Sequence, residues 1–426
     1  MKKNQEIKGK NKRKENRQYA KIKKEFSNKE YEDFEDEEES KEPSGRRKLP
    51  SFGKSCIVIL IIIVISIISA RYVTDESFRT FVDTKVIKKE ISSDTLKKID
   101  IDSENNPNIY AFSKYIAVLS KSKLKMYNSS GKQITNLEVN ISSAIFDSEG
   151  NYLFIGEKTG TKLYLISGLN TVWQSTVEGE ISRVSVNKNG YTSVIVKNTT
   201  YKSVIIVFSP TGKEVFRYNL SSAYAICADI SADNQYLAIG DVDYSGTIVK
   251  SNIKIFSMQK AISDPVNAIV NTYESKTDEI VINIDYSNKN YAVCMFNTYI
   301  EKVSESGNET DCEFNNDVIF SDISLKNNIA VVEKQSSGNF SYAYQMRIKS
   351  TNNKNESLFI LNNSMPKSVM CYGNNIGINY GNEIQIVQSN GWLIKRYTSE
   401  KEVKSLVLGE KIAGVVYKDR IEIINF

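Results

Sequence analysis

The sequence predicts an all-β repeat protein, a β-propeller, preceded by one membrane-spanning helix and a charged N-terminal tail. Three observations predict this architecture. A turn-and-strand pattern recurs from Ile99 to Phe426, one apolar run of 16 residues carries no charge, and charged residues crowd the segment before that run. Alternating apolar strands separated by Asn, Ser, Gly and Asp turns are typical of all-β domains.

The first 54 residues are predicted to be a disordered cytoplasmic tail. They hold 17 Lys or Arg against 12 Asp or Glu, whereas the rest of the chain has 39 of each. Blocks of charge with few apolar residues cannot form a core. The basic patch Arg46, Arg47, Lys48 and Lys54 is predicted to face anionic lipid, although a purely solubilising tail remains an alternative. The neutral remainder argues against nucleic acid as a partner.

The apolar run Ser55 to Ala70 is predicted to be a membrane anchor. It makes about 24 Å of helix, and extension to Val73 gives about 28 Å against a hydrocarbon core of about 30 Å. A buried core helix would show a polar face, and a cleaved signal peptide would not follow more than fifty residues, although Ile68-Ser69-Ala70 is an acceptable cleavage site. Basic residues before the run place the N-terminus in the cytoplasm. Residues 55–73 then span the membrane and residues 74–94 form a stalk.

Two turn signatures recur in the remaining chain. The first is a polar turn before an apolar strand, as in DSEGNYL from Asp147, NKNGY from Asn187, SADNQYLA from Ser231 and SNKNYA from Ser287. These turns begin 40, 44 and 56 residues apart. The second is a strand, a Gly turn and another strand, as in MYNSSGKQI, VFSPTGKEV and IVQSNGWLI. A period of about 40 residues with four short strands is the period of propeller blades.

The repeats predict a propeller over residues 95–426. Seven blades are expected at 108–140, 141–180, 181–223, 224–279, 280–318, 319–369 and 370–406, and residues 407–426 hold only three strands of a last blade. The segment Thr95 to Asp102 is predicted to supply the missing outer strand and to close the ring, which removes a sheet edge. Eight blades are therefore predicted, with seven as the alternative.

These turns resemble the quinoprotein-type repeat and the Asp-Gly or Asn-Gly turn of WD-like repeats. The layout of residues 55–426 also resembles an uncharacterised bacterial family of single-pass, membrane-anchored propellers of unknown function. The resemblance implies a β-propeller fold and permits an assembly scaffold. A quinoprotein dehydrogenase would imply bound quinone, calcium and an adjacent Cys pair, and the sequence has no such pair. No cofactor is therefore expected.

The chain contains no histidine, which removes the commonest general base and metal ligand. Of the five cysteines, Cys56 lies in the apolar run, and Cys227 and Cys371 lie in apolar strand contexts that predict buried thiols. Cys294 and Cys312 fall in one predicted blade, where they either form a disulfide or remain free.

A weak metal candidate lies at Asp241, Asp243 and Ser245. These residues resemble the start of a calcium loop, with oxygen ligands at alternate positions and Gly246 at the sixth. The match fails at the twelfth position, where Asn252 stands in place of a bidentate Glu. A hairpin tip explains the same residues, so no metal site is assigned.

No catalytic constellation emerges, so we expect a protein that is not an enzyme. The sequence favours a protein-interaction scaffold in the cell envelope, bound to the lipid bilayer and to an envelope protein. A module that binds envelope glycans through tyrosines is one alternative. A carboxylate- or metal-dependent enzyme is another, and its sign would be acidic side chains converging at the central channel.

Overall fold

The computed structural model describes residues 51–75, 78, 82, 86–87, 90–91, 96–102, 106–314, 318–336, 342–361 and 364–426. The chain divides into two compact units, residues 1–74 and residues 75–426. Residues 1–50 of the predicted tail (residues 1–54), with the basic residues Arg46, Arg47 and Lys48, lie outside the described residues, and residues 51–54 belong to the first helix instead of the tail.

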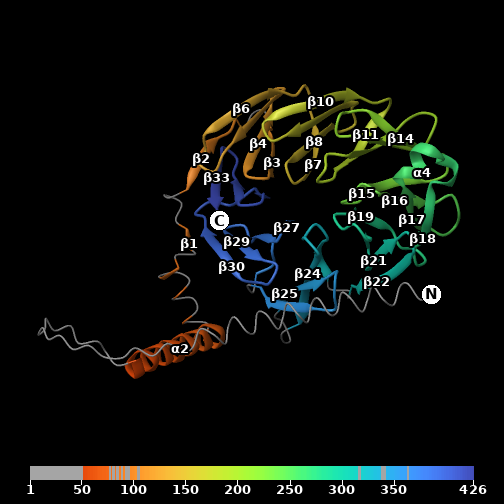
Figure 1. The fold of residues 1–426 in the computed structure, drawn as a ribbon. Coiled ribbons are helices and arrows are strands. Elements are labelled where there is room, and N and C mark those ends of the chain that lie inside the picture. Colours follow the sequence, from red (N-terminus) through yellow and green to blue (C-terminus); the bar gives the residue numbers. More distant parts are fainter. Residues whose placement is uncertain are drawn as a thin grey trace, which may run out of the picture. The chain divides into compact units, whose positions relative to one another are not determined.

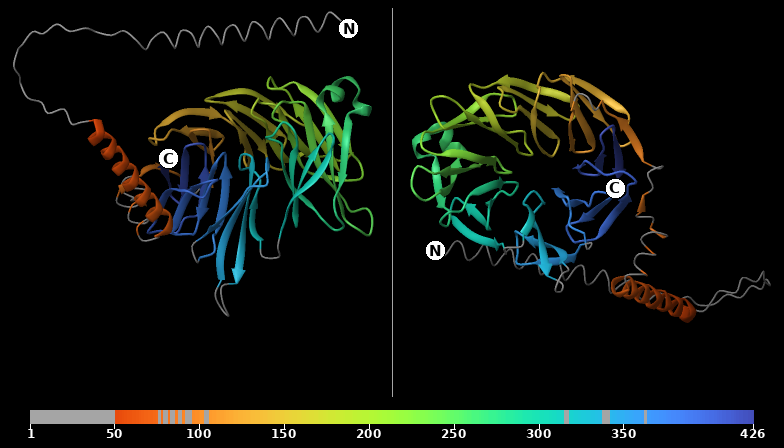
Figure 2. Two further views of the ribbon diagram at one scale, coloured as in Figure 1. Left: turned by 60° about the horizontal axis from the view of Figure 1, so that its bottom comes forward. Right: turned by 180° about the vertical axis from the view of Figure 1, so that it is seen from behind.

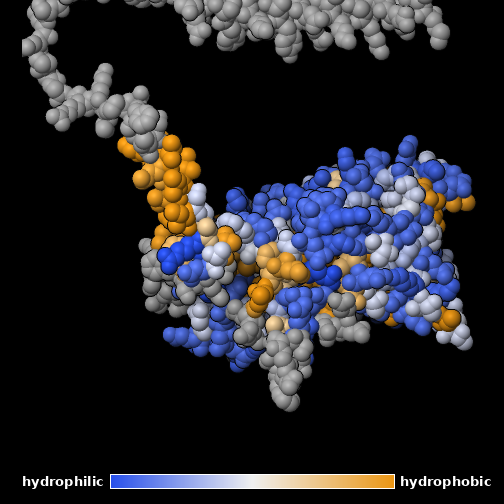
Figure 3. Space-filling view, turned by 90° about the horizontal axis from the view of Figure 1, so that it is seen from below, coloured by the Kyte–Doolittle hydropathy of each residue, from blue (hydrophilic) through white to orange (hydrophobic). Residues whose placement is uncertain are grey.

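The first unit contains helix α2 (Ser51–Thr74), which includes Lys54. Its large apolar side chains are 45–72% exposed, and Figure 3 shows them as a continuous apolar surface. The hydroxyl groups of Ser66 and Thr74 donate to carbonyl oxygens four residues earlier, so they need no other partner. Among the described residues, α2 is the one helix long and apolar enough to cross a membrane. It could therefore serve as a membrane anchor.

The second unit is an eight-bladed propeller, seen along its axis in Figure 1 and from behind in Figure 2. Its strands pair in order within each sheet. Blade 1 comprises β3 (Asn108–Phe112), β4 (Tyr115–Ser120), β5 (Lys123–Tyr127) and β6 (Gln133–Glu138). Blade 2 comprises β7 (Ala144–Glu149), β8 (Tyr152–Glu157), β9 (Lys162–Ser167) and β10 (Asn170–Thr176). Blade 3 comprises β11 (Glu180–Val186), β12 (Thr192–Lys197), β13 (Ser203–Phe208) and β14 (Glu214–Leu220).

Blades 4 to 7 continue the pattern around the ring. Blade 4 comprises β15 (Tyr224–Ile230), β16 (Tyr236–Asp243), β17 (Lys250–Ser257) and β18 (Ile269–Glu274). Blade 5 comprises β19 (Val281–Asp285), β20 (Ala292–Phe296), β21 (Tyr299–Ser304) and β22 (Gly307–Glu313). Blade 6 comprises β23 (Val318–Asp322), β24 (Asn328–Ser336), β25 (Tyr342–Ser350) and β26 (Glu356–Ile360). Blade 7 comprises β27 (Ser368–Tyr372), β28 (Asn375–Asn379), β29 (Glu383–Gln388) and β30 (Leu393–Thr398).

Blade 8 is completed by a strand from the other end of the propeller, as predicted. Strands β31 (Ser405–Leu408), β32 (Ile412–Val416) and β33 (Arg420–Asn425) are followed by β2 (Lys97–Asp100), which pairs antiparallel with β33. Ile99 opposes Ile421 in this pairing, and both side chains are almost completely buried. The prediction of eight blades closed by the segment Thr95 to Asp102 is confirmed, and the seven-blade alternative is wrong.

Several middle strands of the blades are buried on both faces. Every residue of β13 (SVIIVF) is buried, because neighbouring blades cover both sides of the sheet. β-Branched residues such as Val and Ile are favoured in strands that are buried on both faces. Trp173 of β10 is 9% exposed and packs between Phe154 and Phe208 of the next blade, with ring centroids 5.6 and 5.5 Å apart. Trp173 is therefore a core residue, whereas Trp392 is 62% exposed.

At the predicted Gly turns, the backbone packs closely against aromatic side chains of neighbouring blades. Gly212 has a φ of +81°, and a Cβ at this position would lie 2.8 Å from the Trp173 ring. Gly391 has a φ of +79° and lies against the ring of Phe359 in blade 6. Glycine is required at both positions by its backbone conformation and by the lack of space.

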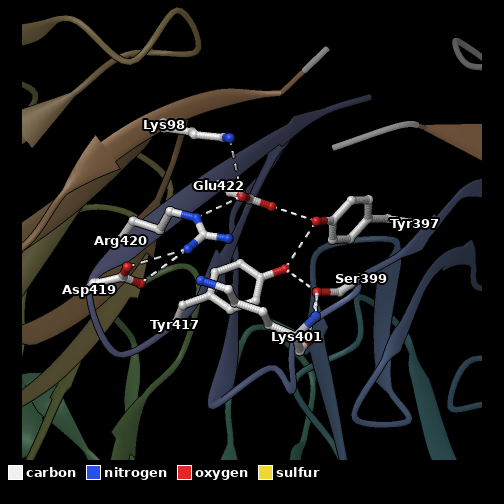
Figure 4. A network of polar contacts seen from close by, with 8 residues as sticks. All are labelled: Lys98, Tyr397, Ser399, Lys401, Tyr417, Asp419, Arg420 and Glu422. Atoms are coloured by element: carbon white, nitrogen blue, oxygen red, sulfur yellow. Dashed lines mark hydrogen bonds and ion pairs between the residues drawn. The ribbon is translucent and has the colours of Figure 1, made fainter. Parts of the chain in front are cut away.

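A buried polar network joins the last two blades (Figure 4). The Glu422 carboxylate is fully buried and accepts hydrogen bonds from the Arg420 guanidinium, at 2.8 Å, and from the Tyr397 hydroxyl. The hydroxyls of Tyr397 and Tyr417 lie 3.0 Å apart, and Tyr417 donates to Ser399 Oγ at 2.7 Å. Blade 7 provides Tyr397, so the network locks it to the closing blade.

Three small elements were not predicted. Strand β1 (Glu90–Ile91), within the expected stalk, adds to the outer edge of β30 in parallel. Helix α4 (Met258–Ser263) and the 3-10 helix η4 (Pro265–Asn267) lie between β17 and β18. All three elements are too short for a periodic pattern. Tertiary contacts position them: Ile91 packs against the core of blades 7 and 8, and Met258 is buried.

Candidate functional site: the central cavity

The first strand of each blade lies toward the centre of the ring in Figure 1, and the ends of these strands surround a cavity of about 710 Å³. All eight blades line it. Blades 1 to 8 contribute, among other residues, Ser113, Asp147, Arg183, Asp229, Asp285, Lys326, Tyr372 and Glu410. A concave site with convergent polar groups is the usual form of a ligand or partner site.

Two carboxylates at the cavity wall join neighbouring blades. Asp147 of blade 2 accepts a hydrogen bond of 2.7 Å from the backbone N–H of Val186 in blade 3. Asp229 of blade 4 accepts one of 2.7 Å from the backbone N–H of Tyr286 in blade 5, and one of 2.6 Å from the Ser185 hydroxyl. Blades 6 and 7 are joined in the same way, because the carboxylate of Asp322 in β23 accepts a hydrogen bond of 3.0 Å from the backbone N–H of Cys371 in β27. This recurring bond gives the inner ends of the strands a structural role.

The carboxyl groups of the cavity also repel one another, and their pKa values are raised. Burial, followed by repulsion from Asp285 and Asp147, raises the pKa of Glu149 to about 7. Burial raises the pKa of Asp229 well above its ordinary value, and repulsion from Asp285 adds to the effect. The pKa values of Asp147 and Asp285 are also raised, mainly by burial. Carboxyl groups perturbed in this way by burial and by each other are typical of functional sites.

Three cationic side chains share the cavity. Arg183 donates to the side-chain oxygen of Asn283. Lys188 and Lys326 line the cavity from blades 3 and 6, and both are exposed. The cavity therefore presents charges of both signs, with carboxyl groups in excess.

The cavity does not present a reactive thiol. Cys227 and Cys371 line it, and both are free and buried, as predicted from their apolar strand contexts. Burial raises the pKa of Cys227 to about 12, so the nucleophilic thiolate is suppressed at neutral pH. The described residues also contain no group of three His, Cys, Asp or Glu side chains that could hold a metal ion.

The candidate calcium residues do not form a site. The Asp241 carboxylate is completely buried and accepts hydrogen bonds from Lys254 and from Asn252, at 3.1 Å for the latter. Asp243 Oδ1 accepts bonds from the N–H and hydroxyl of Ser245, at 2.9 and 2.7 Å, which is an ordinary turn. The hairpin explanation of these residues is the one that the structure supports.

The structure also does not pair Cys294 with Cys312. Both thiols are free and buried. They lie on β20 and β22, and β21 runs between these strands. Strands two positions apart are separated by about 9.5 Å, which exceeds the Cα separation of about 4.4–6.8 Å that a disulfide needs. The sequence placed the two residues in one blade but could not give the strand order between them.

Sequence reasoning missed the cavity carboxylates, although a signal was present. Asp147 begins the first of the recurring turns, and Asp229 and Asp285 each lie two residues before a later one. Each of the three lies within the last three residues of the first strand of its blade. Alignment of the turns would have placed the three side chains within two residues of one position in the repeat.

Comparisons with known proteins agree with the fold. A model of a family of unknown function (DUF5711) matches residues 87–426. The C-terminal WD40 domain of Sif2 is 11% identical, with 78% of this chain and 99% of that chain covered and a TM-score of 0.52. BamB from Moraxella catarrhalis is 12% identical, with 78% and 96% covered and a TM-score of 0.46. No curated protein matches the chain. At these identities, the structural likeness shows the fold alone.

Proposed function

The chain belongs to a family of unknown function (DUF5711), and from this premise we propose that it is a membrane-anchored protein-interaction scaffold of the cell envelope. Helix α2 spans the membrane with the N-terminus in the cytoplasm, and the propeller lies outside. The apolar surface of α2 and the basic residues that precede it in the sequence support this topology.

The central cavity is the observation that carries the proposal. It is concave, it is built by all eight blades, and Lys188 and Lys326 on its lining are exposed. Five carboxyl groups line it against three cationic groups; the carboxyl groups belong to Asp147, Glu149, Asp229, Asp285 and Glu410. This excess favours a partner that inserts a basic loop or side chain.

Site-specific photo-crosslinking in intact cells tests the scaffold. A photoreactive residue replaces Lys188 or Lys326 at the cavity, and the matched control replaces Lys213, an exposed lysine in the turn between β13 and β14. We expect the same envelope protein to be crosslinked from both cavity positions and not from Lys213. Crosslinks of equal yield from all three positions, or none from the cavity, would contradict the proposal.

Chemical labelling tests the topology separately. In a Cys56→Ser background, Lys213→Cys provides one exposed thiol on the propeller, since the four other cysteines are buried. A membrane-impermeant maleimide should label this thiol in intact cells or spheroplasts. Labelling only after lysis would place the propeller in the cytoplasm.

A second candidate function is carboxylate-based catalysis. One observation favours it: acidic side chains converge at the channel, and Glu149 has a pKa of about 7, which suits a general acid or base. The scaffold remains the preferred proposal, because the described cavity residues include neither a metal-ligand cluster nor a reactive thiol. If the partner still crosslinks to the Glu149→Gln variant, binding does not depend on acid or base chemistry at Glu149.

A further inference from the structure

The outer strand of blade 6 has a free edge. Among the described residues, β26 pairs with β25 alone. The N–H of Leu361 donates to the carbonyl of Tyr344 at 2.8 Å, and the register from Ile360 back to Glu356 has no bulge. Because hydrogen-bonding direction alternates along a strand, Glu356, Leu358 and Ile360 point their backbone N–H and C=O groups away from β25.

The side chains on this free edge are apolar. Leu358 is 59% exposed and Ile360 is 85% exposed, and their spacing of two residues puts them on one face of the sheet. Figure 3 shows an apolar patch on the outer wall of the ring at blade 6. The outer strands β22 (GNETDCE) and β2 (KKID), by contrast, carry charges that oppose edge pairing. Strand β26 has one charged residue, Glu356, at its start.

The neighbouring blade shows that an outer edge of this ring accepts an added strand. Strand β1 pairs in parallel with β30, with Glu90 opposite Arg396 and Ile91 opposite Tyr397. This pairing buries part of Ile91 against the core of blades 7 and 8. The outer edge of β30 is thus paired within the chain, whereas no strand among the described residues pairs with the outer edge of β26.

We propose that a second copy of this chain pairs with β26, so that two propellers join edge to edge through one continuous sheet. The strand is complementary to itself. With the twofold axis at Phe359, antiparallel pairing sets Leu358 of each copy opposite Ile360 of the other. Both positions point their backbone groups outward, so each of the two pairs forms two hydrogen bonds. The four apolar side chains then lie together on one face.

The alternative register, centred on Leu358, is less favourable. It sets Ile360 of each copy opposite Glu356 of the other, which places a carboxylate beside an apolar side chain that pairing would bury. The Phe359 register therefore sets apolar side chains opposite apolar side chains. Phe359 itself faces blade 7 and packs near Gly391, so it keeps its contacts within its own propeller.

Sedimentation velocity of the full chain in detergent tests the dimer. The key variant is Ile360→Lys, and its matched control is Val266→Lys in η4, which changes a 90% exposed apolar residue that lies outside any strand. We expect wild type and Val266→Lys to dimerise with the same Kd. In Ile360→Lys the Kd should rise at least about tenfold. A monomeric wild type, or a dimer unaffected by Ile360→Lys, would overturn the proposal; the latter would assign dimerisation to α2 or to another face.

Cysteine crosslinking tests the register independently of any effect on folding. In a Cys56→Ser background, Leu358→Cys and Ile360→Cys are expressed together with different tags. The Phe359 register brings the two positions to a Cα separation of about 5.5 Å, within the disulfide range. We expect mixed-tag disulfides between the two variants. Absence of these disulfides, or efficient crosslinking of Leu358→Cys with itself, would overturn the proposed pairing.

Discussion

The closing blade and the central cavity both bury carboxyl groups, but they treat the charge in opposite ways. At the closing blade, Glu422 is fully buried and meets an arginine and a tyrosine hydroxyl. In the cavity, Glu149 and Asp285 face further carboxyl groups, and their pKa values are raised by burial and by that repulsion. The first arrangement stabilises the ring, and the second leaves carboxyl groups whose ionised form a basic ligand would stabilise.

The difference shows where this propeller uses its acidic residues for stability and where for recognition. When a buried carboxylate is held by charged and hydroxyl donors, removal of one partner strongly destabilises the fold, because the other partner is left buried and unpaired. A carboxyl group among other carboxyl groups destabilises the fold while it is ionised. Mutation of the two kinds of acid should therefore change stability with opposite signs.

The largest expected effect is at Glu422. In Glu422→Ala, the donors of Arg420 and Tyr397 lose their buried acceptor, and the free energy of unfolding should fall by about 3–5 kcal/mol. Urea denaturation of the full chain in detergent measures it. Glu422→Gln keeps the size and one acceptor and should lose less. A loss below about 1 kcal/mol in Glu422→Ala would remove the contrast between the two regions.

The next effect is at the strand that closes the ring. Ile99 is 3% exposed within the core of blades 1 and 8, so Ile99→Ala should lower the free energy of unfolding by about 2–4 kcal/mol. The adjacent Lys98→Ala is the control. Lys98 is 49% exposed and lies 3.9 Å from Glu422, so its loss should cost less than about 1 kcal/mol. If the free energy of unfolding falls equally in the two variants, burial of Ile99 does not account for the contribution of β2 to stability.

In the cavity, the effect of mutation on stability should have the opposite sign and should grow with pH. The folded-state pKa of Glu149 is raised from 4.5 to about 7, so its contribution to stability is present below pH 4.5 and is lost as pH rises through 7. Glu149→Gln should therefore match wild type near pH 4.5. At pH 8 it should be more stable by about 1 kcal/mol, a value reduced for partial exposure. Denaturation at both pH values tests this, and a variant less stable than wild type at pH 8 would refute it.

The smallest effect is expected at an exposed ion pair, which belongs to neither region. Arg217 and Glu214 lie on β14 with side chains 38% and 40% exposed and an N–O distance of 2.8 Å. Arg217→Ala should change the free energy of unfolding by less than about 0.5 kcal/mol, and added salt should weaken even that. A change as large as that of Glu422→Ala would mean that burial does not set the strength of these contacts.

Sequence reasoning succeeded where the signal was local and repeated. The turns at Asp147, Asn187, Ser231 and Ser287 recur once per blade, so the blade number followed from their spacing. The missing strand of the last blade then identified Thr95 to Asp102 as the closing segment. The pairing of Cys294 and Cys312 stayed open in the sequence, because membership of one blade says nothing about which strand separates them. Sequence reasoning missed β1, whose two residues carry no period.

The sequence by itself determined the propeller, its eight repeats and the apolar helix, since these depend on residue patterns along neighbouring positions. Only the tertiary structure decided which acids meet. Closing the ring brings Asp147, Asp229 and Asp285, more than 50 residues apart from one to the next, to the same cavity. Closure also sets Glu422 beside donors from its own blade and from blade 7. The pKa of a carboxyl group depends on distance in space and on burial, and neither is written in the local sequence.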